Sequence, residues 1–364
     1  MAEKLNGLSR ELIFHPGETL REVLEDRGMT QKELAVRTGF SAKHISEVLG
    51  GLAPISVKFA AALECVFGVE AEFWMNLQTN YDIECLEYNE PETVSSEELN
   101  ILRELSGITK YLKDSGQIPK GIKKEDCVLW LRRFFAVNKL TTISKLAING
   151  AFRGSTKNQV NVYVLFAWQR LCEIAADKIE LESSLDTEKL AAQLPYIKSL
   201  MFKDAAIMQK ELRRVFAECG IKFCIVQHFT GAPVQGFIEE NSNGEIILCM
   251  TIRKAFADIF WFTLFHEIAH ILHGDIKERF IDFTFTENEE EDLANEFASN
   301  QLLNPEKYKA FVRVGDFSIH AIKRLAAKEN VPTFIVVGRL QKEERIPYTA
   351  FSSEKVRFVW SGKP

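Results

Sequence analysis

The spacing of hydrophobic and polar residues divides the chain into three regions. From about Glu11 to Asp82, apolar residues recur at helical spacing between glycines, which predicts a compact bundle of short helices. The helical spacing continues from about Glu97 to Gly220 and predicts an all-helical section. Beyond Gly220 the pattern changes to short β-like runs followed by helices, which predicts a small sheet packed with helices.

The β-like runs and the loops between regions set the expected domain boundaries. Asn241-Ser-Asn-Gly244 separates the second and third runs and is typical of a hairpin turn. The stretch from Cys85 to Glu98, which contains an acidic run with Pro and Ser, reads as a linker. The sequence therefore predicts a multidomain protein, mainly α with a C-terminal α+β part. Its expected segments are an N-terminal helical domain (1–83), a linker (84–98), a helical middle section (99–219) and a C-terminal α+β domain (220–364).

Residues 30–50 have the layout of a helix-turn-helix. Thr30 begins a capping box, Gly39 supplies the tight turn, and Ser41 caps the second helix, whose apolar stripe faces inward. The second helix of this layout lies in the major groove of DNA. The side chains expected to face DNA are those of Thr30, Gln31, Ser41, Lys43, His44 and Ser46.

Residues 266–270 read His-Glu-Ile-Ala-His inside an apolar stretch. Histidines at positions i and i+4 lie on one helical face, so the ring nitrogens of His266 and His270 can converge on one metal ion. Glu267 lies beside that face and can take a proton from a water molecule held there. Burying two histidines and a glutamate is costly without a partner such as a metal ion, which favours a metal site.

Zinc needs a third protein ligand and an open position for water. The acidic run at residues 287–292 supplies carboxylates, and Glu291 is in phase with the apolar face of the helix that follows. Glu291 is therefore the expected third ligand, and Glu290 is the alternative. The other carboxylates of the run are expected to face solvent at the start of that helix.

Residues 14–82 resemble the Xre-type helix-turn-helix proteins, and most of all the HigA antitoxin branch. The resemblance lies in Phe14-His-Pro-Gly-Glu-Thr-Leu and Phe73-Trp-Met-Asn-Leu-Gln-Thr-Asn-Tyr-Asp. It implies a five-helix DNA-binding domain that acts as a homodimer. Residues 1–80 carry eight basic and eleven acidic side chains, a net charge of −3. Because phosphate neutralisation provides much of the affinity for DNA, a dimerisation or partner-binding role remains the alternative.

Residues 220–347 resemble the ImmA/IrrE metallopeptidases, through His266-Glu-Ile-Ala-His270 and Glu291-Asp-Leu-Ala-Asn-Glu-Phe-Ala-Ser-Asn-Gln-Leu-Leu-Asn-Pro305. The resemblance implies Zn²⁺ held by His266, His270 and Glu291, with Glu267 as the base. It also implies selective cleavage of a regulatory protein: a helix-turn-helix repressor, a toxin partner or the chain itself.

Three functions are compatible with these features. The first is a helix-turn-helix transcriptional regulator fused to a zinc endopeptidase, which can be latent until a trigger acts. The second is an antitoxin-type repressor whose metallopeptidase-like domain is a sensor with little turnover. The third is an interaction protein with a structural metal, which the glutamate of the His-Glu-x-x-His motif disfavours because a structural site has no use for it.

Composition narrows the setting of these functions. The chain has 364 residues and a net charge of −6, so any DNA binding must come from a local surface. The longest apolar stretch, near Phe256 to Leu272, contains charged residues and histidines, so no membrane association is expected. Seven scattered cysteines without a Cys-x-x-Cys pair, and the lack of an apolar N-terminal run, favour a cytoplasmic protein.

Overall fold

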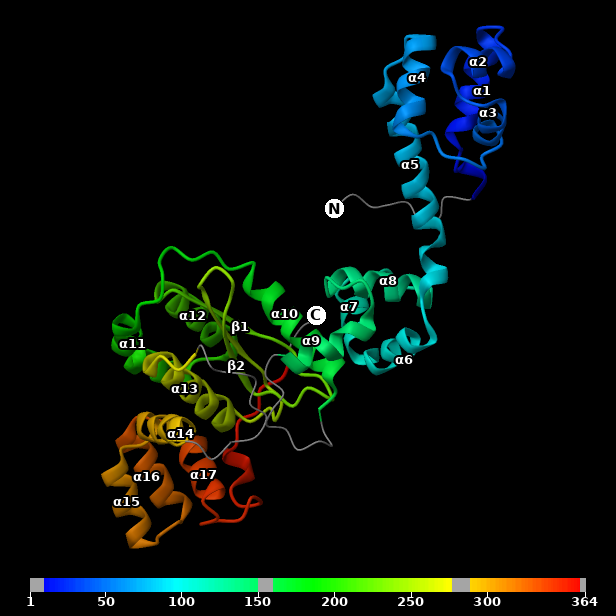
Figure 1. The fold of residues 1–364 in the computed structure, drawn as a ribbon. Coiled ribbons are helices and arrows are strands. Elements are labelled where there is room, and N and C mark those ends of the chain that lie inside the picture. Colours follow the sequence, from blue (N-terminus) through cyan, green and yellow to red (C-terminus); the bar gives the residue numbers. More distant parts are fainter. Residues whose placement is uncertain (1–9, 150–159, 277–288, 361–364) are drawn as a thin grey trace. The chain divides into compact units, whose positions relative to one another are not determined.

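The computed structural model describes residues 10–149, 160–276 and 289–360 (Figure 1). The chain forms two compact units, Met1–Ser96 and Glu97–Pro364. The described residues are mainly helical, and a three-stranded sheet lies in the second unit. The predicted fold class, a mainly α multidomain chain with a C-terminal α+β part, is confirmed. Within the described ranges, no helix combines the length and the apolar character needed to cross a membrane.

The first unit is a bundle of short helices around one apolar core. Thr30, Ser41 and Ser56 each cap the helix that follows by accepting a hydrogen bond from a backbone N–H. Gly39 ends the second helix in the left-handed conformation, which a residue without a Cβ adopts at little cost. The helices are α1 (Pro16–Asp26), α2 (Gln31–Thr38), α3 (Ala42–Leu49), α4 (Val57–Phe67) and α5 (Ala71–Asn89), after a short 3-10 turn, η1 (Arg10–Leu12).

Helix α5 continues through residues 84–89, which we expected to belong to a linker. No glycine or proline lies between Ala71 and Glu90, so nothing in the sequence stops the helix there. A 3-10 turn, η2 (Glu90–Thr93), contains Pro91 in its first turn, where a proline is tolerated. Between η2 and the first helix of the second unit, Val94 and Ser95 are the two residues that lie outside a helix.

The second unit contains the sheet and the remaining helices. In its first part, up to Gly220, the described residues form helices and no strand, as predicted. It consists of α6 (Ser96–Glu104), α7 (Ser106–Asp114), α8 (Lys124–Phe134), η3 (Leu140–Thr142), α9 (Ile143–Asn149), α10 (Val162–Ala176), α11 (Thr187–Ser199), η4 (Leu200–Phe202) and α12 (Ala205–Glu218). After the strands follow α13 (Ala257–His273), α14 (Glu289–Leu302), α15 (Pro305–Val314), α16 (Ile319–Glu329), α17 (Thr333–Lys342) and η5 (Ser352–Glu354).

The sheet has the order β1-β3-β2, with β1 (Ile221–Ile225), β2 (Gly236–Glu240) and β3 (Ile246–Met250). Strands β2 and β3 form the predicted antiparallel hairpin, closed by a hydrogen bond from Asn241 N to Glu245 O of 3.0 Å. Strand β1 runs parallel to β3. Because β3 lies in the middle, β2 forms one edge of this sheet.

One apolar core contains residues of the sheet, of helices that precede the strands in the sequence and of helices that follow them. Leu212 and Phe216 of α12 belong to the same buried cluster as Leu248 of β3 and Leu264 of α13. The expected boundary at residue 219 therefore does not separate two cores, since α11 and α12 pack with the sheet and α13. Helix α10 contacts the other face of the sheet, where the Trp168 ring meets Phe237 edge-on at 5.7 Å.

Candidate functional site

Helix α13 carries the His-Glu-x-x-His residues in the interior of the second unit. Its apolar side chains pack against the sheet and against α14 and α17, and Gly274 ends it in the left-handed conformation. His266, Glu267 and His270 are buried, with exposed fractions of 5%, 4% and 1%. Three polar side chains therefore lie in a part of the molecule where unpaired polar groups are costly.

Helix α14 brings Glu291 to the two histidines. The Nε2 atoms of His266 and His270 are 3.1 Å apart. Glu291 Oε2 lies 3.1 Å from His266 Nε2, and Glu291 Oε1 lies 3.4 Å from His270 Nε2. The three ligand atoms all lie within 4.8 Å of one another, and all three residues are buried. Glu290, the alternative third ligand, is exposed on the same helix.

A third acidic residue of the site, Asp275, contacts His270. Asp275, just past the end of α13, places Oδ2 2.7 Å from His270 Nδ1, on the side of the ring away from Glu291. A carboxylate in this position fixes the tautomer of a metal-binding imidazole and makes its other nitrogen a better ligand. Asp275 was not among the residues expected from the sequence. Its only sequence signal is its place directly after the helix-ending Gly274.

The backbone of β2 lies against Glu267. Gly236, the first residue of β2, is so close that a Cβ atom there would overlap Glu267 Oε1 and lie 2.8 Å from Cγ and Cδ. Only glycine leaves room for the glutamate at this position. The sheet edge and the candidate base are thus in direct contact.

The helix-turn-helix of the first unit is formed by α2 and α3, joined through Gly39. Gln31, Lys43 and Ser46 are exposed, and Lys43 Nζ lies 3.7 Å from Glu47 of the same helix. Thr30 and Ser41 are exposed, and their hydroxyls accept the capping hydrogen bonds of α2 and α3.

His44 lies differently from the other residues expected to face DNA. Its ring stacks on Phe40 at 5.1 Å and meets Phe59 edge-on at 5.2 Å. The side chain is half-buried, because the α3 position that it occupies borders the apolar stripe. Sequence spacing placed His44 on the outward face and did not reveal these aromatic neighbours.

Two known protein families match this chain, one in each of its two units. A model of the helix-turn-helix family matches residues 20–74, which span α1 to the start of α5. A model of the IrrE N-terminal-like domain, a peptidase family, matches residues 259–341, from α13 to α17. The chain belongs to the Xre-like helix-turn-helix proteins and carries an IrrE-like domain.

Several known proteins are similar to the helix-turn-helix unit of this IrrE-like protein. Virulence-associated protein I of Dichelobacter nodosus is 36% identical over 75 residues, which are 20% of this chain and 69% of that protein. The antitoxin HigA of Pseudomonas aeruginosa, solved with its higBA promoter, is 29% identical with a TM-score of 0.21, and covers 23% of this chain and 97% of its own. A HigA-family addiction module antidote protein of Coxiella burnetii is 31% identical with a TM-score of 0.21, and covers 23% and 96%.

Proposed function

We propose that this helix-turn-helix, IrrE-like protein is a transcriptional regulator whose second unit is a zinc-dependent endopeptidase. The observation that carries the proposal is the convergence of His266, His270 and Glu291 within 4.8 Å, on helices that match the IrrE N-terminal-like domain. Glu267 is buried beside them and in contact with the edge of the sheet.

The donor set fits a catalytic zinc site. Two imidazole nitrogens and one carboxylate are the protein ligands of one common class of zinc peptidase, which leaves a fourth position open. Asp275 supplies the carboxylate that such a histidine usually contacts through its other nitrogen. Zinc, when bound by these residues, supplies a Lewis acid that polarises a carbonyl and lowers the pKa of water to about 7.

In the proposed reaction Glu267 acts first as a general base and then as a general acid. Its carboxylate accepts a proton from the attacking water, whose oxygen forms the new bond to the scissile carbonyl carbon. Glu267 then gives the proton to the departing amine nitrogen as the C–N bond breaks. The products are a carboxylate and an amine, so one water molecule is consumed for each peptide bond.

The position of β2 suggests how a substrate is held. Gly236–Glu240 is paired on one side only within the described sheet, and it begins at Glu267. An extended peptide can add to such an edge by main-chain hydrogen bonds, which would place its backbone beside the base. Proline substitution of Ile238, on this strand, should then lower cleavage. Unchanged cleavage by a folded variant would refute this mode of binding.

Metal content and proteolysis together test the proposed function. The full chain and its His266→Ala and Glu267→Gln variants would be purified, supplied with zinc and examined by metal analysis. Each would then be incubated with candidate helix-turn-helix proteins, including this chain. We expect about one zinc per wild-type chain, lost in His266→Ala and kept in Glu267→Gln, with cleavage lost in both variants. Zinc binding without any cleavage would favour the sensor function, and no zinc binding would refute the catalytic proposal.

We also propose that the first unit binds operator DNA through α3 and the start of α2. The support is the helix-turn-helix match and the exposure of Gln31, Lys43 and Ser46. Lys43→Ala should weaken binding to the DNA upstream of the chain's own gene and lower the salt dependence of that binding. Lys58→Ala, in the same unit but on α4, is the control.

A further inference from the structure

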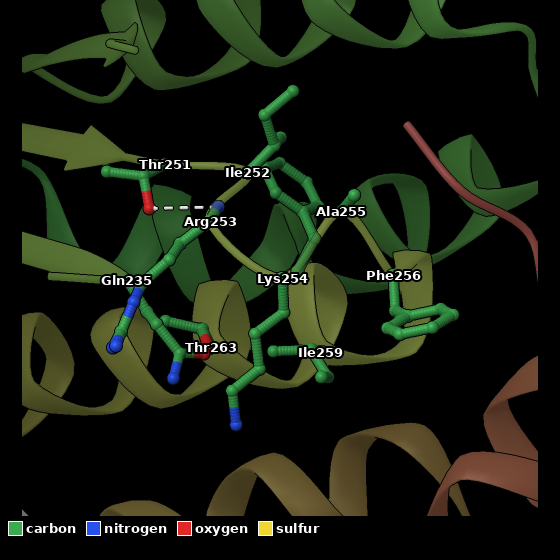
Figure 2. A pocket seen from close by; sticks show the side chains of 10 residues that line it. Gln235, Thr251, Ile252, Arg253, Lys254, Ala255, Phe256, Ile259 and Thr263 are labelled. Atoms are coloured by element: carbon green, nitrogen blue, oxygen red, sulfur yellow. Dashed lines mark hydrogen bonds between the residues drawn. The ribbon is translucent and has the colours of Figure 1, made fainter. Parts of the chain in front are cut away.

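A second polar site adjoins the candidate active site. The loop between β3 and α13 forms a small, shallow pocket together with the residue that precedes β2 and the N-terminal half of α13 (Figure 2). Its polar side chains are those of Gln235, Thr251, Arg253, Lys254 and Thr263, and the Thr251 hydroxyl donates a hydrogen bond of 2.7 Å to Val234 O. Figure 2 shows the ends of the Gln235 and Lys254 side chains on the same side of the loop, beside Thr263. The pocket thus presents amide, hydroxyl and cationic groups together.

The two cations of this pocket have no carboxylate partner among the described residues. Arg253 Nη1 donates a hydrogen bond of 2.8 Å to Pro233 O, and its backbone N–H donates to Thr251 Oγ1 at 3.4 Å. Lys254 is exposed. Burial lowers the pKa of His228, and the nearby Arg253 guanidinium lowers it further. Arg253 therefore holds the loop in place by hydrogen bonds. The positive charges of Arg253 and Lys254 remain available to an anion.

The pocket lies close to where a peptide bond would be cut. Gln235 directly precedes Gly236, whose backbone contacts Glu267. Thr263 lies on α13 one helical turn before Glu267. An extended peptide running along β2 would therefore carry a side chain into this pocket within a few residues of the scissile bond.

The chain itself contains a segment of complementary charge. Residues 84–97, here called the acidic connector, include five glutamates and no lysine or arginine. The connector links the helix-turn-helix unit to the IrrE-like unit, and most of its residues are exposed. It also contains Val94 and Ser95, the two residues between η2 and α6 that lie outside a helix. Cleavage there would separate the two units of the chain.

We propose that the pocket around Arg253 and Lys254 binds a glutamate side chain of the acidic connector from a second copy of this chain, and thereby directs hydrolysis of that connector. The inference rests on the proposed endopeptidase function. The reaction adds one water molecule across one peptide bond of the connector. It releases the helix-turn-helix unit of one copy by the action of another.

A binding measurement tests the pocket without any need for turnover. A fluorescein-labelled peptide of residues 84–97 is titrated with the full-length Glu267→Gln chain, and fluorescence anisotropy gives the Kd. The control peptide has glutamine at all five glutamate positions. We expect the acidic peptide to bind at least about fivefold more tightly than the control, and each of Arg253→Gln and Lys254→Gln to reduce this preference.

Two further variants serve as controls. Arg253→Lys should keep most of the preference for the acidic peptide, and Lys328→Gln, which changes an exposed lysine of α16, should leave the preference unchanged. Equal binding of the two peptides overturns the inference.

A cleavage measurement tests the occupant. Tagged Glu267→Gln chain is the substrate, and untagged zinc-loaded wild-type chain is the enzyme, so any cut in the tagged copy occurs between two copies. Mass spectrometry should locate the cut within residues 84–97, and Lys254→Gln enzyme should make it several-fold more slowly. A cut elsewhere, or the same rate with Lys254→Gln, overturns the inference and leaves the endopeptidase function intact. If the acidic peptide binds selectively but no protein is ever cleaved, the endopeptidase function fails and the pocket's preference for the connector stands as binding alone.

Discussion

The backbone of Gly236 lies directly against the side chain of Glu267. A Cβ atom at position 236 would overlap Glu267 Oε1 and lie within 2.8 Å of Cγ and Cδ. Gly236 is also the first residue of an edge strand, and it pairs with Met250 in the middle of the sheet. The contact therefore fixes the distance between the sheet edge and the candidate base, and no larger residue can occupy this position without moving one of the two.

Gly236→Ala should abolish most peptidase activity while zinc is retained. The new methyl group displaces the Glu267 carboxylate, whereas the three ligands on α13 and α14 stay in place. Loss of a correctly placed general base costs about 10²–10⁴-fold in rate. Cleavage rate and zinc content of the same preparation are the two measurements.

Gly107→Ala is the matched control for that substitution. A Cβ at position 107 meets only the Phe229 ring, at an ordinary 3.7 Å. Since alanine is the better helix former, this variant should be folded and at least as stable as the wild type. Full activity in Gly236→Ala would contradict the role given to the Gly236–Glu267 contact.

Asp275→Asn should weaken zinc binding without preventing folding. The Asp275 carboxylate lies 2.7 Å from His270 Nδ1 and holds the ring with Nε2 towards the site. Loss of such a supporting carboxylate usually lowers metal affinity about 10–100-fold. Competition with a chelator of known affinity gives the zinc Kd, and Asp292→Asn, an exposed carboxylate on α14, is the control. If both variants bind zinc as tightly as the wild type, Asp275 has no part in the site.

The difference between Glu291 and Asp275 explains what the sequence could predict. The sequence predicts Glu291 as a ligand because it shares a helical face with apolar residues. In the structure the same face of α14 is buried. Asp275 follows a left-handed glycine, where the direction of the chain depends on one backbone conformation and no periodicity exists. Ligands on regular elements can thus be predicted, and supporting residues in the turns between them cannot.

The strands give a similar lesson. The turn at Asn241–Gly244 specified the β2–β3 hairpin, because a short loop leaves only one way to pair its flanking strands. Nothing in the run Ile221–Ile225 specified that it pairs in parallel with β3 and leaves β2 at the edge. Amphipathic spacing likewise identified α12 as a helix without showing that it packs on the sheet.

Glu98 shows where an acidic run misleads. The sequence predicts that it belongs to the linker, whereas it is completely buried against Arg132 and accepts hydrogen bonds of 2.9 and 2.7 Å from the guanidinium. It also accepts a hydrogen bond of 3.0 Å from Leu140 N. The pairing partner lies 34 residues away on α8, so composition alone could not reveal it.

Glu98→Ala should strongly destabilise the helical part of the second unit. Removal of one partner leaves the Arg132 charge buried without its carboxylate, which typically costs about 3–5 kcal/mol. Hydrogen exchange of the amides in α6 and α8 measures this locally. Glu97→Ala, at the exposed neighbouring position, should change stability by less than about 0.5 kcal/mol. Similar exchange in both variants would show that the buried pair contributes little.

Glu239 should make the stability of the second unit fall as pH rises. Burial raises the pKa of its carboxyl to about 7, and the charge of Glu173 on α10 adds to this effect. The folded chain therefore keeps a proton that the unfolded chain releases above its ordinary pKa of 4.5. The free energy of unfolding thus declines between about pH 4.5 and 7 and is lowest above that range.

The Glu239→Gln variant has no buried carboxylate to ionise, so it should melt at a higher temperature than the wild type at pH 8. The expected gain in the free energy of unfolding is about 1–3 kcal/mol at pH 8 and much smaller at pH 5. Glu240→Gln, the exposed neighbour on β2, controls for the loss of a charge. An equal effect of Glu239→Gln at the two pH values would mean that this carboxyl titrates near its ordinary pKa in the folded chain.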